Sequence, residues 1–207
     1  MATTKARTPP KPRARDTRRA REVERTRQDI LEAAARVFAA RGYHASTMQV
    51  IAREAGFTAA SLYTYFPGKE SIYAALVEAF GARILAVFEE PVPASLTFAQ
   101  QLELLLQRQL QLVAEHADAL RLMFDLGPPQ VDGRVDQSPR HYLARSARFL
   151  EEASRGALRV DAAEAALLLH GLGHAHVLGW LVGGDALDPA RMAARITDLF
   201  LHGAARR

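Results

Sequence analysis

The sequence of 207 residues contains no cysteine, which excludes disulfide bonds, thiolate zinc sites and cysteine nucleophiles. It has no stretch in which apolar and polar residues alternate with many β-branched side chains, so strands are not expected. Its length excludes a large multidomain enzyme and fits one domain of ordinary size or two small ones. With 49% hydrophobic and 24% charged residues, the chain is typical of a globular protein with a real core.

A charged segment followed by an apolar one, as in a secretory leader, is also missing near Met1. We therefore expect a cytoplasmic protein. Lysine is scarce, because only three of the 27 basic residues are lysines. Since this bias makes arginine identity uninformative, the position of the charges is the better guide.

Positive charge gathers in the first third of the chain. The whole sequence carries a net charge of +4, but residues 1–69 contain 14 Lys and Arg against six Asp and Glu. Residues 70–207 contain 13 and 17, respectively, and are therefore net negative. Such an asymmetry is expected when one end of a protein meets a polyanion.

Residues 1–21 form a basic segment with eight Lys and Arg, a single acid and no apolar side chain larger than alanine apart from Met1 and prolines. Such a segment cannot bury enough surface to fold alone, so we predict a disordered basic arm. It could be a solubilising tail, or an arm that follows phosphates or enters a minor groove.

Three helices are predicted next, at about 23–41, 48–55 and 59–66. Gly42 and Gly56 stand where the first two end, and Thr47 and Thr58 offer N-caps for the second and third. Further helical patterns cover residues 69–88, 98–116, 118–126, 138–155, 161–182 and 188–202, with a loop at 127–137. The sequence therefore predicts an all-α protein of about nine helices.

Residues 47–66 carry the clearest functional signal. Two short capped helices joined by Ala-Gly-Phe-Thr match a helix-turn-helix, in which a short turn containing glycine sets two helices at a steep angle. The run from Thr26 to Ala75 resembles the DNA-binding domain of the tetracycline-repressor (TetR) family. The residues that carry this resemblance are Arg27, Ile30, Leu31, Ala33, Ala34, Phe38, Gly42, Tyr43, Ser46, Thr47, Ile51, Ala52, Ala55, Gly56, Ser61, Leu62, Tyr63, Tyr65, Phe66, Lys69 and Glu70.

The resemblance implies an N-terminal DNA-binding domain at 22–68 and a helical effector-binding and dimerisation domain at 69–207. In the family, residues matching Thr47, Tyr65 and Lys69 usually bind phosphates, whereas those matching Gln49, Ala59, Ala60 and Tyr63 lie against bases. The exposed face of helix 59–66 also presents small and hydroxylated groups that can approach a groove. The candidate DNA-binding residues are Thr47, Gln49, Thr58, Ala59, Ala60, Ser61, Tyr63, Tyr65 and Lys69.

Two observations bear on the roles assigned to these candidate DNA-binding residues. Many family members have serine and glycine where Thr58 and Ala60 stand. Tyr63 and Tyr65 could instead be core aromatics under the next helix, the role that we expect for Phe66.

Residues 165–184 contain no Asp, Glu, Lys or Arg and are long enough to cross a bilayer. They include three histidines and five glycines, and no other segment supports insertion, so we expect no membrane partner. A buried helix is favoured. Paired with the helix at 188–202, the helix at 161–182 would suit the four-helix homodimer interface of the family.

His170 and His174 share one helix face, a spacing that two metal ligands can use. No third ligand is identifiable, so we expect neither a metal nor a cofactor there, and a role in lining a ligand pocket is favoured. Aromatic and methionine residues could line such a pocket or be plain core. The candidate lining residues are Phe88, Met123, Phe124, Tyr142, Phe149, His174 and Trp180.

The resemblance thus implies a homodimeric, sequence-specific transcriptional repressor, not an enzyme, that binds a palindromic double-stranded DNA operator. The resemblance implies that a small-molecule effector of unknown identity releases it. Two alternatives stay open: a DNA-binding protein controlled by a protein partner, or a helical metal-binding or ligand-binding protein that uses His170 and His174.

Overall fold

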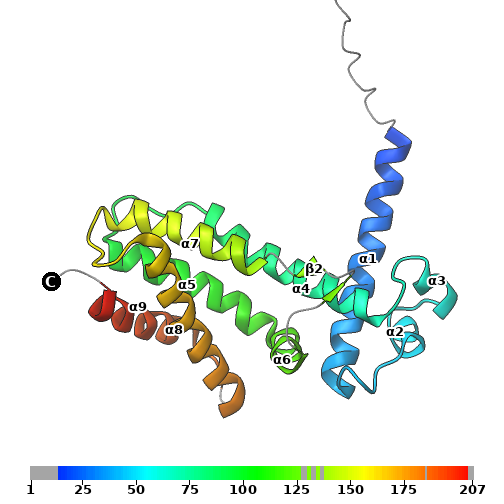
Figure 1. The fold of residues 1–207 in the computed structure, drawn as a ribbon. Coiled ribbons are helices and arrows are strands. Elements are labelled where there is room, and N and C mark those ends of the chain that lie inside the picture. Colours follow the sequence, from blue (N-terminus) through cyan, green and yellow to red (C-terminus); the bar gives the residue numbers. More distant parts are fainter. Residues whose placement is uncertain (1–13, 127–129, 132–133, 136–137, 185, 205–207) are drawn as a thin grey trace, which may run out of the picture.

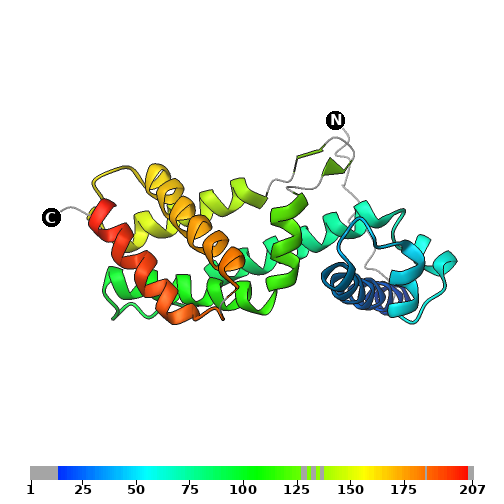
Figure 2. The same cartoon turned by 90° about the horizontal axis from the view of Figure 1, so that it is seen from below.

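The computed structural model describes residues 14–126, 130–131, 134–135, 138–184 and 186–204. These residues form nine α-helices, one turn of 3-10 helix and one pair of two-residue strands, in an elongated arrangement (Figure 1). Helices α1 to α3 lie at one end and α8 and α9 towards the other, with α4 running between them (Figure 2). The predicted all-α fold is confirmed.

The N-terminal unit consists of α1 (Ala14–Arg41), α2 (Met48–Glu54) and α3 (Ala59–Tyr63). Its apolar core is closed by the first half of α4 (Lys69–Ala86). The buried side chains of this core come from these four helices and the turn after α3, with Leu122 from further along the chain. They are Ile30, Leu31, Ala34, Val37, Phe38, Met48, Ile51, Ala52, Leu62, Phe66, Ile72, Tyr73, Val77 and Leu122.

The remaining helices build a second core. They are α5 (Phe98–Glu115), α6 (Ala117–Leu126), α7 (Ser138–Ser154), α8 (Ala162–Gly183) and α9 (Pro189–Ala204), and the 3-10 turn η1 (Val87–Glu89) follows α4. Helix α5 packs against α9, and α7 packs against α8. The largest fully buried side chains of this core are Leu102, Leu150, Ile196 and Phe200.

Local chemistry explains why these helices begin and end where they do. Thr97 caps α5, and the Gln100 side chain accepts from the Thr97 backbone N–H at 2.9 Å, which completes a capping box. Asp161 caps α8 by accepting from the Glu164 N–H at 2.8 Å. Gly184 ends α8 with φ +75°, a left-handed conformation that favours glycine.

Helices α4 and α6 contribute to both cores. Ile72 and Val77 of α4 lie in the N-terminal core, whereas Phe80 of the same helix packs against the second. Leu122 of α6 lies in the first core and Leu120 in the second. Two helices therefore connect the units directly, so a shift of either helix is felt in both.

The structure corrects the predicted limit of the arm at residue 21. Helix α1 begins at Ala14, so residues 14–21 are helical, while residues 1–13 lie outside the described residues. The segment was expected to stay unfolded because it buries no apolar surface. Extending an existing helix avoids the nucleation cost, and arginine and alanine are good helix formers. An ion pair between Arg18 and Glu22, at 3.0 Å, adds i,i+4 support.

Two smaller differences concern α3 and the predicted loop. Helix α3 ends at Tyr63 instead of residue 66, because the N–H of Tyr65 donates to Leu62 O and the chain tightens into a turn. The predicted loop at 127–137 contains β1 (Gln130–Val131) and β2 (Arg134–Val135), which pair antiparallel. With two residues each, these strands leave the fold class unchanged.

Two helical stretches are long and apolar enough to cross a membrane by length and composition alone: 69–89 and α8. The core helices of soluble proteins pass the same test. In α8 the buried side is formed by Ala165, Leu169 and Val177, which pack into the second core. The prediction of a buried helix is nevertheless wrong for the described chain, because Leu167, Leu168, Leu178 and Val182 of α8 are exposed.

Candidate DNA-binding surface and ligand cavity

Two threonines and one glycine fix the geometry of α2 and α3. Thr47 Oγ1 accepts from the Val50 N–H at 3.3 Å, and Thr58 Oγ1 accepts from the Ser61 N–H at 3.2 Å, so both predicted N-caps are confirmed. Between them Gly56 adopts φ +76°, which a side chain would strain. These bonds and this turn produce the helix-turn-helix.

Helix α3 buries one side and exposes the other. Leu62 and Phe66 are almost completely buried, whereas Tyr63 is 50% exposed. Tyr65 is partly buried, with its ring centroid 6.4 Å from that of Phe57. Of the nine predicted DNA-binding residues, the exposed ones are Thr47, Gln49, Thr58, Ala60 and Tyr63, and the partly buried ones are Ala59, Ser61, Tyr65 and Lys69.

Arg27 of α1 holds the turn that follows α3. Its Nη1 donates to the carbonyl of Tyr65 at 2.7 Å, and its guanidinium lies 4.2 Å from the ring centroid of Phe66. Arg27 therefore makes a charge-assisted hydrogen bond to Tyr65 and a cation–π contact with the next residue, Phe66. The sequence pattern includes Arg27 but does not reveal this anchoring role, since its partners lie far along the chain.

Lys69, the first residue of α4, ties that helix to the loop before α2. Its ammonium donates to the carbonyls of Tyr43, His44 and Ser46 at 3.1, 3.4 and 3.4 Å. It also lies 4.5 Å from the Tyr43 ring centroid. Burial, then the charge of Glu70, raises the pKa of Tyr43 to about 12, so its hydroxyl stays neutral.

The exposed face of α1 carries positive charge towards its N-terminal end. Arg18, Arg19, Arg21 and Arg25 are all exposed, and Figure 1 shows α1 extending beyond α2 and α3. Arg18 is offset by its ion pair with Glu22. A long basic helix beside the helix-turn-helix adds attraction for a polyanion.

The second unit contains a cavity of about 540 Å³, within the usual range for drug-sized ligands. Six helices line it: α4, α5, α6, α7, α8 and α9. Helix α4 supplies Val77, Phe80, Gly81, Ile84 and Leu85. The helix that begins at the DNA-binding unit therefore forms one wall of this cavity.

Four polar side chains line the cavity, and none of its described lining residues carries a permanent charge. Gln109 Oε1 accepts from the Tyr142 hydroxyl at 3.1 Å. The Tyr142 ring stacks on His170, with centroids 5.2 Å apart, and His170 lies 6.0 Å from His174. His174 in turn packs against Phe124 at 4.8 Å. These rings form a continuous row from α7 across α8 to α6.

Burial affects the protonation of two of these side chains, Tyr142 and His170. Burial raises the pKa of the Tyr142 hydroxyl, which therefore remains a hydrogen-bond donor. Burial, and then the charge of His174, lowers the pKa of His170. Burial thus favours the neutral forms of Tyr142 and His170 in this largely apolar cavity.

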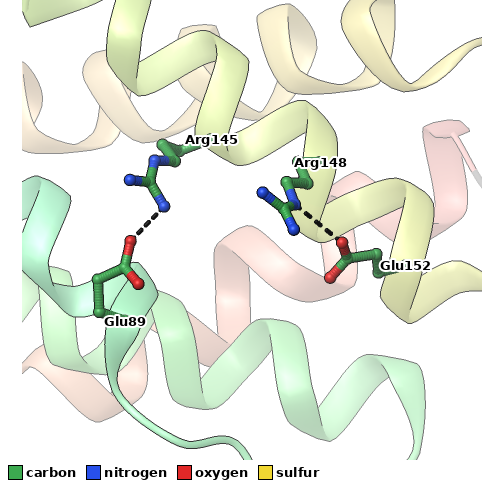
Figure 3. A network of polar contacts seen from close by, with 4 residues as sticks. All are labelled: Glu89, Arg145, Arg148 and Glu152. Atoms are coloured by element: carbon green, nitrogen blue, oxygen red, sulfur yellow. Dashed lines mark hydrogen bonds and ion pairs between the residues drawn. The ribbon is translucent and has the colours of Figure 1, made fainter. Parts of the chain in front are cut away.

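An ion pair fixes the far end of the α4 segment. Glu89 of η1 pairs with Arg145 of α7, and nearby Arg148 pairs with Glu152 along α7 at 2.9 Å (Figure 3). All four side chains are largely exposed, so each pair contributes little to stability. The Glu89–Arg145 pair links η1 to α7, whereas the Arg148–Glu152 pair lies within α7.

Comparison with known proteins identifies the family and the relatives that this chain resembles. The family model described as "Bacterial regulatory proteins, tetR family" matches residues 30–76, from α1 into α4. The HTH-type transcriptional regulator YdgC of Bacillus subtilis (strain 168), itself uncharacterized, is 27% identical over 86% of this chain and 92% of its own length. Residues 30–76 match the TetR family. Both the family model and YdgC are transcriptional regulators, and neither is an enzyme.

Solved structures extend the likeness to the whole TetR fold. The fatty acid degradation regulator FadR of Bacillus halodurans superposes with a TM-score of 0.74, covering 85% of this chain and 94% of that one at 21% identity. FadR of Bacillus subtilis, solved in complex with stearoyl-CoA, gives 0.68, covering 85% and 98% at 22% identity. At these identities the structures establish the fold alone.

The cavity brings together only part of the lining predicted from sequence. Met123, Phe124, Tyr142 and His174 line it. The predictions for the other three need correction, because Phe88, Phe149 and Trp180 do not contribute to this lining. Phe88 contacts Tyr142 from η1 at 5.7 Å, and Phe149 and Trp180 pack against the second core.

Helical geometry explains these three errors. Phe149 shares a face of α7 with Tyr142 but lies two turns further along, past the part of α7 that meets the cavity. Trp180 follows His174 by six residues and therefore projects from another side of α8. Phe88 lies beyond the C-terminal end of α4. Residue type alone does not reveal where along a helix a cavity ends.

His170, for which a role in lining a pocket was favoured, lines the cavity, whereas sequence reasoning missed Gln109 and the wall formed by α4. A signal for Gln109 exists, because it is a polar residue within an apolar stripe that includes Leu105, Leu106 and Val113. No comparable signal marks α4, whose apolar residues read as ordinary core. Among the described residues, no group of three His, Asp or Glu side chains could hold a metal ion.

Proposed function

We propose that this TetR-family regulator is a homodimeric repressor that binds a palindromic operator through α3 and is released by a small-molecule effector. The observation that carries the DNA-binding half is the exposed face of α3, on which Ala60 and Tyr63 stand free beside a capped, rigid turn. Two such helices would enter successive major grooves roughly 34–36 Å apart.

The phosphate contacts are assigned to Thr47, Tyr65 and Lys69, and the base contacts to Gln49, Ala59, Ala60 and Tyr63, with Thr58 and Ser61 beside them. These assignments follow the family pattern. Net positive charge on α1 and its N-terminal extension supports them, because counterion release drives binding to DNA. The domain limits that go with this proposal are 22–68 for DNA binding and 69–207 for regulation.

Helices α8 and α9 are proposed to form the dimer interface. The described chain leaves five large apolar side chains of these helices exposed: Leu167, Leu168, Leu178, Val182 and Leu199. Exposed apolar residues gathered on one pair of helices are typical of an interface. A second copy packed there in a four-helix arrangement would cover them.

The cavity is proposed as the effector site. FadR of Bacillus subtilis, which shares the fold, has been solved with stearoyl-CoA, and the apolar cavity supports a small-molecule effector here also. Val77 and Met123 line the cavity and also pack in or against the N-terminal core. An effector that displaces α4 or α6 therefore moves the DNA-binding unit and changes the spacing of the two α3 helices. A DNA-binding regulator of this kind acts in the cytoplasm.

The first test is binding of the purified chain to the intergenic DNA beside its own gene, against excess unrelated DNA. Specific binding that survives competition supports the proposal, since specificity over non-specific binding is the decisive quantity. A chain that shows no preference for any fragment of a randomised DNA library would contradict it.

A further inference from the structure

The polar atoms of the cavity restrict what kind of molecule can occupy it. Only Gln109, Tyr142, His170 and His174 interrupt an otherwise apolar lining. All four belong to one row of ring contacts and hydrogen bonds. In Gln109, however, only Oε1 has a hydrogen-bond partner, and Nε2 has none.

A charged group in this cavity would find no permanently charged partner among the described lining residues. None of the described lining residues is Lys, Arg, Asp or Glu, and burial favours the neutral form of His170. Moving a carboxylate or phosphate from water into such surroundings is strongly unfavourable unless it is paired. The enclosed part of a ligand is therefore expected to be neutral.

Gln109 adds a positive requirement. Its side chain is only 6% exposed, and its Nε2 is buried without any hydrogen-bond partner. The Tyr142 hydroxyl occupies Oε1 of the same amide, so Nε2 is the amide group left to donate to a ligand, which it reaches by a small rotation of the Gln109 side chain. An unmade buried hydrogen bond is costly, so a ligand that accepts from Nε2 recovers this loss.

We propose that the enclosed part of the effector is uncharged and largely apolar, and that it carries one acceptor oxygen that receives a hydrogen bond from Gln109 Nε2. This inference rests on the proposed function, in which the cavity is the effector site. Ketones, esters and thioesters have this chemistry. A ligand such as an acyl-CoA fits only if its phosphates remain outside, because no lining cation would meet them.

Three matched probes test the proposal: valerophenone, pentylbenzene and 5-phenylpentanoate. They share a phenyl ring and a five-carbon chain but present a neutral acceptor, no acceptor and an anion, respectively. Their dissociation constants are measured by displacement of the neutral apolar dye N-phenyl-1-naphthylamine from the full-length protein. We expect the anion to bind at least tenfold more weakly than the ketone.

The variant Gln109→Met removes the donor at similar volume. We expect the affinity of valerophenone relative to pentylbenzene to fall about tenfold in this variant. Gln107→Met, an exposed glutamine on the same helix, is the matched control and should leave the ratio unchanged. Unchanged dye affinity in Gln109→Met verifies that the cavity is intact.

The infrared carbonyl stretch of bound valerophenone decides the proposal if Gln109→Met does not fold. A shift to lower frequency than in an apolar solvent is expected for a carbonyl that accepts a hydrogen bond, and no shift would overturn the proposal. Dodecanoyl-CoA tests whether the acceptor oxygen belongs to a free ligand or to an acyl chain attached to coenzyme A. Binding that weakens in Gln109→Met supports a thioester, absence of binding supports a free ligand, and binding indifferent to the variant contradicts the proposal.

The two levels of proposal fail differently. If the dye itself does not bind, the cavity is not a ligand site and the effector half of the proposed function fails. If the dye binds but the anion competes as well as the ketone, the neutral effector class is wrong. The proposed effector class is also wrong if Gln109→Met leaves the relative affinities of the probes unchanged. In both cases the cavity remains a ligand site.

Discussion

Among single residues, Tyr63 offers the cleanest separation of recognition from stability. Because its side chain is half exposed, Tyr63→Ala should change the free energy of unfolding by no more than about 0.5 kcal/mol. Loss of its groove contacts should reduce discrimination between operator and unrelated DNA by ~1–3 kcal/mol. Competition binding and urea unfolding measure the two effects. Leu62→Ala, at the buried neighbour, should show the reverse pattern, with ~2–5 kcal/mol of lost stability.

Lys69 has two roles to separate, because its ammonium already meets three carbonyls. Lys69→Met keeps the length of the side chain and leaves these acceptors without their donor, so we expect ~1–3 kcal/mol of lost stability. If the charge also meets a phosphate, the slope of log affinity against log salt falls by about one unit for all DNA sequences. Lower stability with an unchanged slope would limit Lys69 to a structural role.

His170 makes stability depend on pH in a defined direction. Its pKa is lowered in the folded chain, so the unfolded chain takes up the proton first as pH falls. Stability should therefore decline on acidification, in the window between the ordinary histidine pKa of about 6.5 and the lowered folded value. Denaturant unfolding at several pH values should show a smaller decline for His170→Gln. The exposed His141→Gln serves as the control.

At the scale of elements, local sequence signals determined most helix limits. The capping residues predicted at Thr47 and Thr58 are confirmed by their hydrogen bonds, and Asp161 caps α8 in the same way, because a cap depends on neighbours within four residues. The start of α1 and the end of α3 were predicted wrongly. The first depends on extension from a folded helix, and the second on the turn that Arg27 holds from 38 residues away. Neither cause is visible in a local window.

The proposed interface of α8 and α9 predicts a response to one charge. Val182 is 80% exposed on α8, so Val182→Glu should fold normally but shift the protein towards monomer, since a buried unpaired carboxylate opposes association. Sedimentation velocity measures this shift. Val23→Glu makes the same change at an exposed valine of α1 and should leave the oligomeric state unchanged. Equal effects of both changes would contradict the assigned interface.

At the scale of the whole molecule, the sequence predicted two units but not which helices contribute to both cores. The apolar residues of α4 fit one helix, yet the structure divides them between two cores and a cavity wall. Only tertiary packing determines which turn of a helix meets which core. Likewise, Met123 was predicted as a lining residue, but its contact with the N-terminal core was not. These shared helices provide the physical route for coupling.

Coupling through α4 and α6 predicts that DNA binding and ligand binding change each other's affinity by the same factor. If valerophenone lowers operator affinity by some factor, saturating operator must lower valerophenone affinity by the same factor, because both belong to one thermodynamic cycle. Since α4 and α6 take part in both units, we expect a coupling of ~1–3 kcal/mol. Ligand titrations with and without a selected operator duplex measure it, with unrelated DNA as the control. Full operator affinity with the cavity saturated would show that filling it does not drive release.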